Sequence, residues 1–416
     1  MQRRLFLKQV ALGAVGTAAA PCPLFAGQAT SSESVAAAPA QLDPAVAHDW
    51  LARWEKGILS DSRNRYCDRE VGEEIGWLIS PFLSGFYYGY LATRDVKWVA
   101  LFTDWADAWI QRGVKEPDAF IGWPKSGSGG AAAEGFYSDS LLGEAMGLRP
   151  VVLMAAEIQR TPALMAKYGP RAEAWLTLAG RVFEKWDTRG CWRTVKDGGL
   201  WVVPAFGFDQ QSGKWTDGYA RRATAGFSNP ANKQNHIARW LLAMHDVTKQ
   251  PVYRERAEQW FRLMRSRMRT RADGKYFVWN YWDPAGPWDY KPDESPQHWV
   301  GVHPNGGYYA IDVEGMVAAY EQGLVFSKSD LQCLIATNRD FMWNQQVAGA
   351  QFQRIDGGPT DARWKSSVGV LWTALVPHDD TLRKVFLAHH NPAGWGGLAA
   401  TPWFLAQAAA GTAANR

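Results

Sequence analysis

From about residue 48 onward, hydrophobic residues recur three and four positions apart along most of the chain. This spacing places the apolar side chains on one face of a helix, so it predicts a succession of amphipathic α-helices. The clearest candidates are residues 48–59, 96–112, 140–158, 172–186, 232–248 and 253–269. Two further pairs follow, 307–323 with 329–343 and 364–376 with 381–389.

Three junctions between these helices share one arrangement: an apolar helix, a short polar turn with threonine, and a second helix with aromatic and charged residues. They are GYLATRDVKWVALFTDW, AEIQRTPALMAKYGPRAEAW and MHDVTKQPVYRERAEQWF. A helical hairpin cannot bury both faces alone, so a series of hairpins has to stack into a solenoid or close into a ring. Roughly six or seven hairpins fit the length, which predicts an all-α fold, an (α/α)6 or (α/α)7 toroid (incomplete barrel) whose inner helices surround a funnel.

Two stretches depart from the helical pattern. Residues 198–219 and 275–290 are aromatic and β-prone, and glycine and proline interrupt both. They predict long loops or hairpins inserted into the ring. Loops held by a rigid scaffold commonly carry binding sites, so we expect function on these insertions.

The N-terminus has the pattern of an export signal. The segment MQRRLFLK contains paired arginines, and a short, weakly apolar stretch ending in small residues follows it. This pattern predicts a twin-arginine signal peptide over residues 1–30, a flexible linker over 31–45 and a single toroid catalytic domain over 46–416. The expected partner is the twin-arginine export machinery, and the expected location is the periplasm or the exterior of the cell.

Charge and motif content exclude several classes of function. Lys and Arg number 45 against 41 Asp and Glu, and three of the basic residues lie in the leader, so the rest is nearly neutral and a nucleic-acid partner is not expected. After the leader no apolar stretch is long enough for a membrane helix. Metal-ligand spacings, GxSxG, GxGxxG and P-loop patterns are absent from the sequence, so we expect no cofactor.

Aromatic residues are abundant, with 23 Trp, 14 Tyr and 18 Phe. Many of the tryptophans occupy core-like helical positions. Four stand in loop-like sequence beside polar groups, where a flat ring with a polar edge suits the apolar face of a sugar. These four are Trp279, Trp282, Trp288 and Trp299. For an exported protein they predict carbohydrate binding.

Polar residues suited to proton transfer occur in a definite order along the chain. His236 lies in SNPANKQNH next to Asn235, and His303 lies in HPNGGYYAID just before Tyr309. The order Asn235, His303, Tyr309, Arg354 resembles that of polysaccharide lyases with (α/α) toroid folds, most of all the exported lyases that act on glucuronan and alginate.

The resemblance implies cleavage of a 1,4-linked uronate polymer by β-elimination. Asn235 and Arg354 would neutralise the uronate carboxylate, and Tyr309 with His303 would handle the protons. His236 stays an alternative to His303 as the base, and Arg271 is an alternative from the aromatic loop. The substrate would be an acidic polysaccharide. The expected substrate-binding residues are Tyr137, Trp279, Trp282, Trp288, Tyr290, His298, Trp299 and Tyr308, and Glu134 and Asp139 are further candidates to line the funnel.

Two other functions stay open. A glycoside hydrolase on the same toroid would use paired carboxylates, for which Asp139, Glu144, Asp312 and Glu314 are candidates. Asp312 and Glu314 are two residues apart, which places them on different sides of a helix and argues against that pair. A non-catalytic glycan-binding protein would keep the aromatic loops without a convergent set of polar residues.

Overall fold

The computed structural model describes residues 42–126, 136–204, 207–209, 212–216, 226–358 and 369–414. All of these residues belong to one compact unit, Ala37–Arg416. The predicted leader and most of the predicted linker lie outside the described residues, as does Glu134. Within the described part, none of the helices is long and apolar enough to cross a bilayer.

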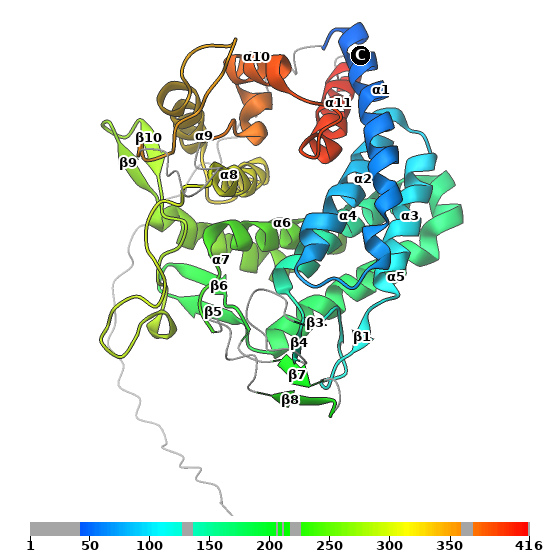
Figure 1. Cartoon of the computed structure of the whole chain (residues 1–416), viewed down its shortest axis with the longest axis vertical. Coiled ribbons are helices and arrows are strands. Elements are labelled where there is room, and N and C mark those ends of the chain that lie inside the picture. The colour runs from blue at the N-terminus through cyan, green and yellow to red at the C-terminus, as the bar shows by residue number, and fades with distance from the viewer. Residues whose placement is uncertain are drawn as a thin grey trace, which may run out of the picture. The chain divides into compact units, whose positions relative to one another are not determined.

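Inner and outer helices alternate along the chain (Figure 1). The first five inner helices pack one on the next, the sixth packs on the first, and an apolar cluster joins the fifth to the sixth, so the inner layer closes into a ring. The inner layer consists of α2 (Ser80–Thr93), α4 (Leu141–Arg160), α6 (Ala231–Thr248), α8 (Gly306–Glu321), the 3₁₀ helix η8 (Thr373–His378) and α11 (Gly397–Ala414). The outer layer consists of α1 (Pro44–Asp61), α3 (Lys97–Ile110), α5 (Pro162–Thr188), α7 (Pro251–Arg267), α9 (Lys328–Ala336) and α10 (Asp380–His389).

This arrangement confirms the predicted all-α toroid, and the described residues form six helical pairs. The weakest part of the prediction is the helix over 364–376. Part of that range lies outside the described residues, and only a 3₁₀ helix at Thr373–His378 represents this inner position. The neighbouring outer helix is also shorter than predicted, because α9 ends at Ala336 and continues as a π-helical turn, Thr337–Met342.

Tryptophan side chains fill the space between the two layers. Eight that are almost completely buried there are Trp54, Trp98, Trp105, Trp109, Trp186, Trp201, Trp240 and Trp372. A second apolar cluster joins the two ends of the ring, where Trp50 of α1 meets Val376, Phe386 and Phe404. Each large aromatic side chain buries much apolar surface, and this burial holds the two helical layers together.

The connections between helices differ in length on the two sides of the ring. An inner helix leads to the next outer helix through a short turn: Arg94 and Lys249, both with positive φ, end α2 and α6. The connections from outer to inner helices are long, except that residues 390–396 alone join α10 to α11. They therefore all lie beside the N-terminal ends of the inner helices.

These long connections carry short antiparallel strands. Two strand pairs are β1 (Val114–Lys115) with β2 (Ile121–Gly122), and β5 (Trp192–Val195) with β6 (Gly198–Trp201); a third is β9 (Arg269–Arg271) with β10 (Tyr276–Val278). A four-stranded sheet has the order β3 (Lys125–Ser126), β4 (Phe136–Ser138), β7 (Gly207–Asp209) and β8 (Lys214–Thr216). The described residues of the predicted insertions at 198–219 and 275–290 are part of this loop-covered face.

Candidate functional site

The N-terminal ends of three inner helices meet at one carboxylate, that of Glu73. Glu73 precedes the π-helical turn Ile75–Ile79 that leads into α2. Its two oxygens lie 3.1 and 3.3 Å from Nζ of Lys233 in the first turns of α6, and Oγ of Ser140, the N-cap of α4, lies 3.4 Å from Oε2. Lys233 and Ser140, from two other inner helices, therefore hold the Glu73 side chain in place. We call this region, at the N-terminal ends of the inner helices, the mouth of the ring.

A second carboxylate, Glu74, follows directly in the chain. It pairs with Lys125 of β3 and accepts a hydrogen bond of 3.1 Å from the backbone nitrogen of Gly72. Burial alone would raise the pKa of Glu74, but the hydrogen bonds from Lys125 and from backbone N–H groups outweigh it and lower the pKa below its ordinary value. Glu74 is therefore ionised at neutral pH.

Aromatic side chains gather beside these carboxylates. Tyr281 stacks on Tyr308, with ring centroids 5.2 Å apart, and the His303 ring lies 4.7 and 4.8 Å from the two. Burial raises the pKa of Tyr281, and the charges of Tyr308, Asp312 and Glu73 add to this effect, so Glu73 is within electrostatic range of the Tyr281 ring. Trp299 approaches His303 with ring centroids 6.2 Å apart and keeps half of its surface exposed.

Beyond the mouth, the inner helices α6 and α8 carry polar side chains that form a polar wall of the ring. His236 is packed against the edge of the exposed Trp77 ring. Burial, together with the charges of Arg239 and Arg149, lowers the pKa of His236 well below its ordinary value, so this imidazole is neutral. Arg239 pairs with Glu314 across helices α6 and α8. In the part of the chain that the structure describes, no cluster of His, Cys, Asp or Glu could hold a metal ion.

Comparisons with known proteins concern the fold. Neither a family model nor a curated protein matches the chain. Two solved structures that do match are inactive variants of an α-1,6-mannanase from Salegentibacter sp. HEL1_6, in complex with α-1,6-mannotriose and α-1,6-mannotetrose. They are 10% and 11% identical, with TM-scores of 0.46 and 0.47, and the match covers 88% of this chain and 99% of each of theirs.

These structures correct the expected family. The matching proteins are glycoside hydrolases and not uronate lyases, so the predicted resemblance to glucuronan and alginate lyases is wrong, and so is the predicted lyase activity. An acidic polysaccharide is expected only for the lyase reaction, so an acidic substrate has no support once the lyase activity is rejected. At this level of identity the likeness concerns the fold alone, so the chemistry has to be argued from the residues of this chain.

Part of the predicted set does come together at the mouth. The hydroxyl of Tyr309 accepts a hydrogen bond of 2.8 Å from the backbone nitrogen of His303. Arg354 donates to the carbonyl of Val302 at 3.3 Å and pairs with Asp356 at 2.7 Å. Burial, followed by the charge of Arg354, lowers the pKa of His303. His303 and Tyr308 are therefore neighbours of Tyr281, and Arg354 lies close to His303. The order of these residues in the chain does not reveal this grouping.

Asn235 and Tyr309, in contrast, are buried in the core. The amide of Asn235 donates to Asp312 at 2.7 Å and accepts from Nε1 of Trp260 at 3.0 Å. A Cβ atom on Gly315 would lie 2.5 Å from the Asn235 side-chain oxygen, so the glycine leaves the room that this cluster needs. Its hydrogen bonds are used internally, and in this conformation Asn235 cannot reach a substrate carboxylate.

The predicted binding residues also divide into two groups. Trp279 and Trp282 are almost completely buried, with their Nε1 atoms hydrogen-bonded to Asp312 and to the carbonyl of Ser228, so neither offers a face to a sugar. Trp288 is half-buried and donates to Ser228 Oγ at 2.9 Å, and His298 packs against Trp282. The exposed members are Tyr290 and Trp299, while Tyr137 lies in β4 beside a different pocket.

The carboxylates proposed for a hydrolase from the sequence occupy other places. Asp139 and Glu144 are buried between the layers, where both bind Nζ of Lys185. Asp312 is buried in the core, and only Glu314 faces the polar wall of the ring. Sequence reasoning missed Glu73, Glu74 and Lys233. The signal that could have found the first two is the adjacent pair in VGEEIGW, directly before an inner helix.

Because Asp312 is a buried carboxyl group, we expect the free energy of unfolding to depend on pH. Burial raises its pKa from 3.8 to about 7, against the hydrogen bonds from Trp279 and Asn235. Because the folded-state pKa is above the unfolded value, the contribution of Asp312 to stability is complete below about pH 4 and is lost as the pH rises to about 7. At 1.36 kcal/mol per pKa unit the loss is about 4 kcal/mol.

The Asp312→Asn variant removes this titration. We expect the free energy of unfolding of the wild type, relative to the variant, to fall between pH 4.5 and pH 8 in urea titrations. Other titrating groups, such as His390, are common to both proteins and cancel in the difference. A difference that stays constant over this range would contradict the assignment.

Proposed function

We propose that the protein is a glycoside hydrolase that cleaves a glycan at the mouth of the ring, with Glu73 as its essential carboxylate. The observation that carries the proposal is the position of Glu73: an ammonium group pairs with it, and it lies at the meeting point of three inner helices, beside the Tyr281, Tyr308 and His303 rings. Glycoside hydrolases cleave the glycosidic bond with carboxyl groups, and flat aromatic faces suit the apolar side of a sugar, so this arrangement can bind and cleave a glycan.

The chemistry follows from this environment. Glycosidic hydrolysis commonly uses two carboxyl groups, one as the acid and one as a base or nucleophile. Glu73, paired with Lys233 and placed at the meeting point of three inner helices, suits the base or nucleophile. Two carboxylates are candidates for the second group. Glu74 is next in the chain, but its lowered pKa disfavours the role of acid, and Asp356 is linked through Arg354 to the backbone beside His303.

The aromatic residues and the predicted leader fit the same function. The exposed Trp77 and Trp299 offer ring faces at the mouth, where the apolar side of a sugar can pack. Export through the twin-arginine pathway would bring the enzyme to the periplasm or outside the cell, where polymeric glycans are found. The predicted signal thus supports a polysaccharide as the substrate.

The first test is the release of reducing ends. The full chain is incubated with α-1,6-mannan, α- and β-glucans, xylan, and bacterial and fungal cell-wall polysaccharides. We expect reducing ends to accumulate on one of these polymers, and proton NMR of the first product shows whether the anomeric configuration is retained or inverted. Binding of a polymer without any new reducing ends would favour a non-catalytic glycan-binding protein instead.

The second carboxylate is identified with substrates of different leaving-group quality. A general acid is needed for a poor leaving group such as a sugar hydroxyl and is dispensable for an activated aryl glycoside. Glu74→Gln and Asp356→Asn are each compared on the natural polymer and on the aryl glycoside. The acid is the residue whose loss abolishes cleavage of the polymer and spares that of the aryl glycoside.

A further inference from the structure

Exposed aromatic side chains mark one face of the ring. Among the residues that the structure describes, the exposed Trp, Tyr and Phe side chains are Trp77, Trp215, Tyr290, Trp299 and Trp395. All five stand in connections that lead from an outer to an inner helix, on the side of the mouth, and the described turns on the opposite side carry none. Aromatic rings that only stabilise a core are buried, so exposed rings gathered on one face indicate a binding surface.

Trp395 is held on a tight turn just before the inner helix α11. The backbone nitrogen of Gly394 donates to the carbonyl of Asn391 at 3.2 Å, and that of Gly397 donates to the carbonyl of Gly394 at 2.8 Å. The turn needs a glycine at Gly397, because a Cβ atom there would lie 2.5 Å from the Asn391 carbonyl oxygen. Trp395 itself is 47% exposed. An exposed ring on a rigid turn can bind a ligand at little cost in conformational entropy.

Two aromatic neighbours support the Trp395 ring without covering it. Phe82 of α2 and Tyr66 meet it at interplanar angles of 82° and 84°, with ring centroids 5.7 and 6.3 Å away. The exposed guanidinium of Arg69 lies 4.5 Å from the centroid of the Tyr66 ring. Its Nη2 donates to the carbonyl of Asn64 at 3.0 Å, and its other N–H groups have no hydrogen-bond partner among the described residues. A flat ring and available donors therefore share Tyr66 as a neighbour.

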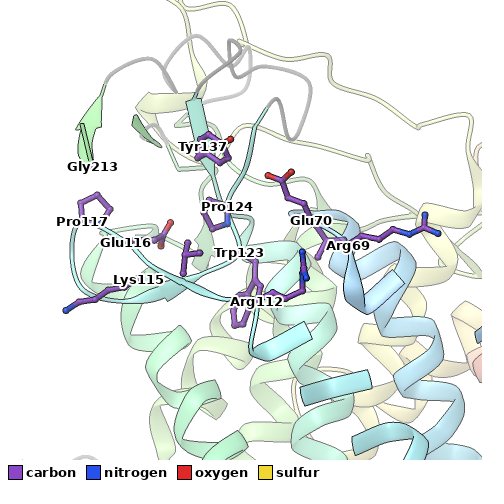
Figure 2. A pocket seen from close by; sticks show the side chains of 12 residues that line it. Arg69, Glu70, Arg112, Lys115, Glu116, Pro117, Trp123, Pro124, Tyr137 and Gly213 are labelled. Carbon is purple, nitrogen blue, oxygen red and sulfur yellow. The ribbon is translucent and has the colours of Figure 1, made fainter. Parts of the chain in front are cut away.

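This aromatic group belongs to the segment that carries Glu73. Tyr66 and Glu73 lie seven residues apart in the connection between α1 and α2, which limits the distance between their Cα atoms to about 25 Å. Within that connection, the 3₁₀ turn η2 (Tyr66–Asp68) packs against the π-helical turn that follows Glu73. Arg69, between the two, borders a pocket of about 520 Å³, and Figure 2 shows its side chain extending away from that pocket. Trp395 therefore lies on the rim of the mouth, beside the segment that holds the proposed essential carboxylate.

We propose that Trp395 and Arg69 form a distal saccharide-binding site, which holds a sugar unit of the glycan several units away from the bond at Glu73. The apolar C–H face of the sugar packs on the Trp395 ring, and its hydroxyl oxygens accept hydrogen bonds from Arg69 and from the Trp395 Nε1–H. The proposal rests on the proposed function for the identity of the glycan. It adds a requirement on length, because only a chain that reaches from Glu73 to Trp395 uses this site.

The test compares ligands of different length in a protein that cannot cleave them. Calorimetric titrations in the Glu73→Gln background use the trisaccharides and hexasaccharides of the manno, xylo, cello and malto series. Trp395→Phe keeps a flat ring, whereas Trp395→Leu keeps an apolar side chain without a ring face. Arg69→Ala removes the guanidinium donors. Met165→Ala is the matched control, because Met165 is a large apolar side chain, 37% exposed, on the outer helix α5.

We expect Trp395→Leu and Arg69→Ala to lower hexasaccharide affinity about five- to tenfold, and Trp395→Phe to lower it less. Trisaccharide affinity should stay unchanged, because a short ligand bound at the mouth does not reach the distal site. Wild-type hexasaccharide affinity in a folded Trp395→Leu protein overturns the proposal, as does a lack of binding by all four hexasaccharides. An equal loss for both ligand lengths also overturns it, because Trp395 would then act through the structure of the mouth.

Further outcomes separate the distal site from its alternatives. If light scattering shows a wild-type dimer that Trp395→Leu converts to a monomer, the exposed ring binds a second copy of the chain and the proposal is wrong. If Trp395→Leu weakens hexasaccharide binding while no polymer is ever hydrolysed, the distal site stands and the hydrolase proposal fails. If a polymer is hydrolysed and Trp395→Leu leaves hexasaccharide binding unchanged, the hydrolase proposal stands and the distal site fails.

Discussion

Replacing Glu73 by glutamine is expected to lower the rate of glycan hydrolysis by roughly 10²- to 10⁴-fold, the usual contribution of a positioned acid or base. The amide has nearly the same shape and can still receive a hydrogen bond from Lys233 and from Ser140. It cannot carry the negative charge that a base or nucleophile needs. The loss should therefore be in kcat, with little change in folding.

The measurement is initial-rate kinetics on the polymer identified by the reducing-end assay, with the melting temperature recorded for each variant. Glu184→Gln is the matched control, because Glu184 is also a carboxylate paired with a cation, Arg181, and lies on the exposed surface of α5. A Glu73→Gln enzyme with activity within threefold of the wild type would remove Glu73 from the mechanism.

Replacing Lys185 by methionine is expected to lower the free energy of unfolding by about 3 to 5 kcal/mol, because breaking a buried ion pair leaves charges that neither water nor a partner compensates. Lys185 is fully buried, and its Nζ lies 2.6 Å from Oε1 of Glu144 and 3.1 Å from the carbonyl of Ile121. It also pairs with Asp139, so two buried carboxylates lose their ammonium partner at once and Asp139 keeps only Arg189.

Urea titrations of the purified variants measure this loss. Lys167→Met is the control, because Lys167 is an exposed lysine on the same helix, α5. Adding Asp139→Asn and Glu144→Gln to Lys185→Met should recover part of the stability, since the uncompensated charges are removed together. A loss below 1 kcal/mol in the single variant would show that the three groups are solvated in the folded protein.

Most of the described helices could be predicted because their signal is local, whereas the position near η8 and the last inner helix, α11, were not. Apolar residues three and four apart define one buried face, and a polar turn such as that at Arg94 separates two such faces. Ring closure follows from the number of hairpins, each of which needs a neighbour on either side. The π-helical turn after α9 has no comparable signature, since TNRDFM continues the pattern of an ordinary helix.

The aromatic residues show where local reasoning fails. Trp279, Trp282 and Trp299 stand in similar loop-like sequence, yet the first two are buried and only the third is half exposed. Burial there depends on partners from elsewhere in the chain: Asp312 receives the Trp279 N–H and Ser228 receives that of Trp282. The sequence of a loop does not indicate which of its tryptophan side chains will find such a hydrogen-bond acceptor in the folded chain.

By itself, the sequence determined the succession of helical hairpins and the side of the ring on which the long loops lie, because helix periodicity and turn length are properties of neighbouring residues. The tertiary structure alone decided which carboxylates reach the mouth. Glu73 meets Ser140 and Lys233 across 67 and 160 residues of chain, while Asp139, next to Ser140, turns into the space between the layers toward Lys185. Such meetings depend on how the inner helices pack on one another, which no run of neighbouring residues specifies.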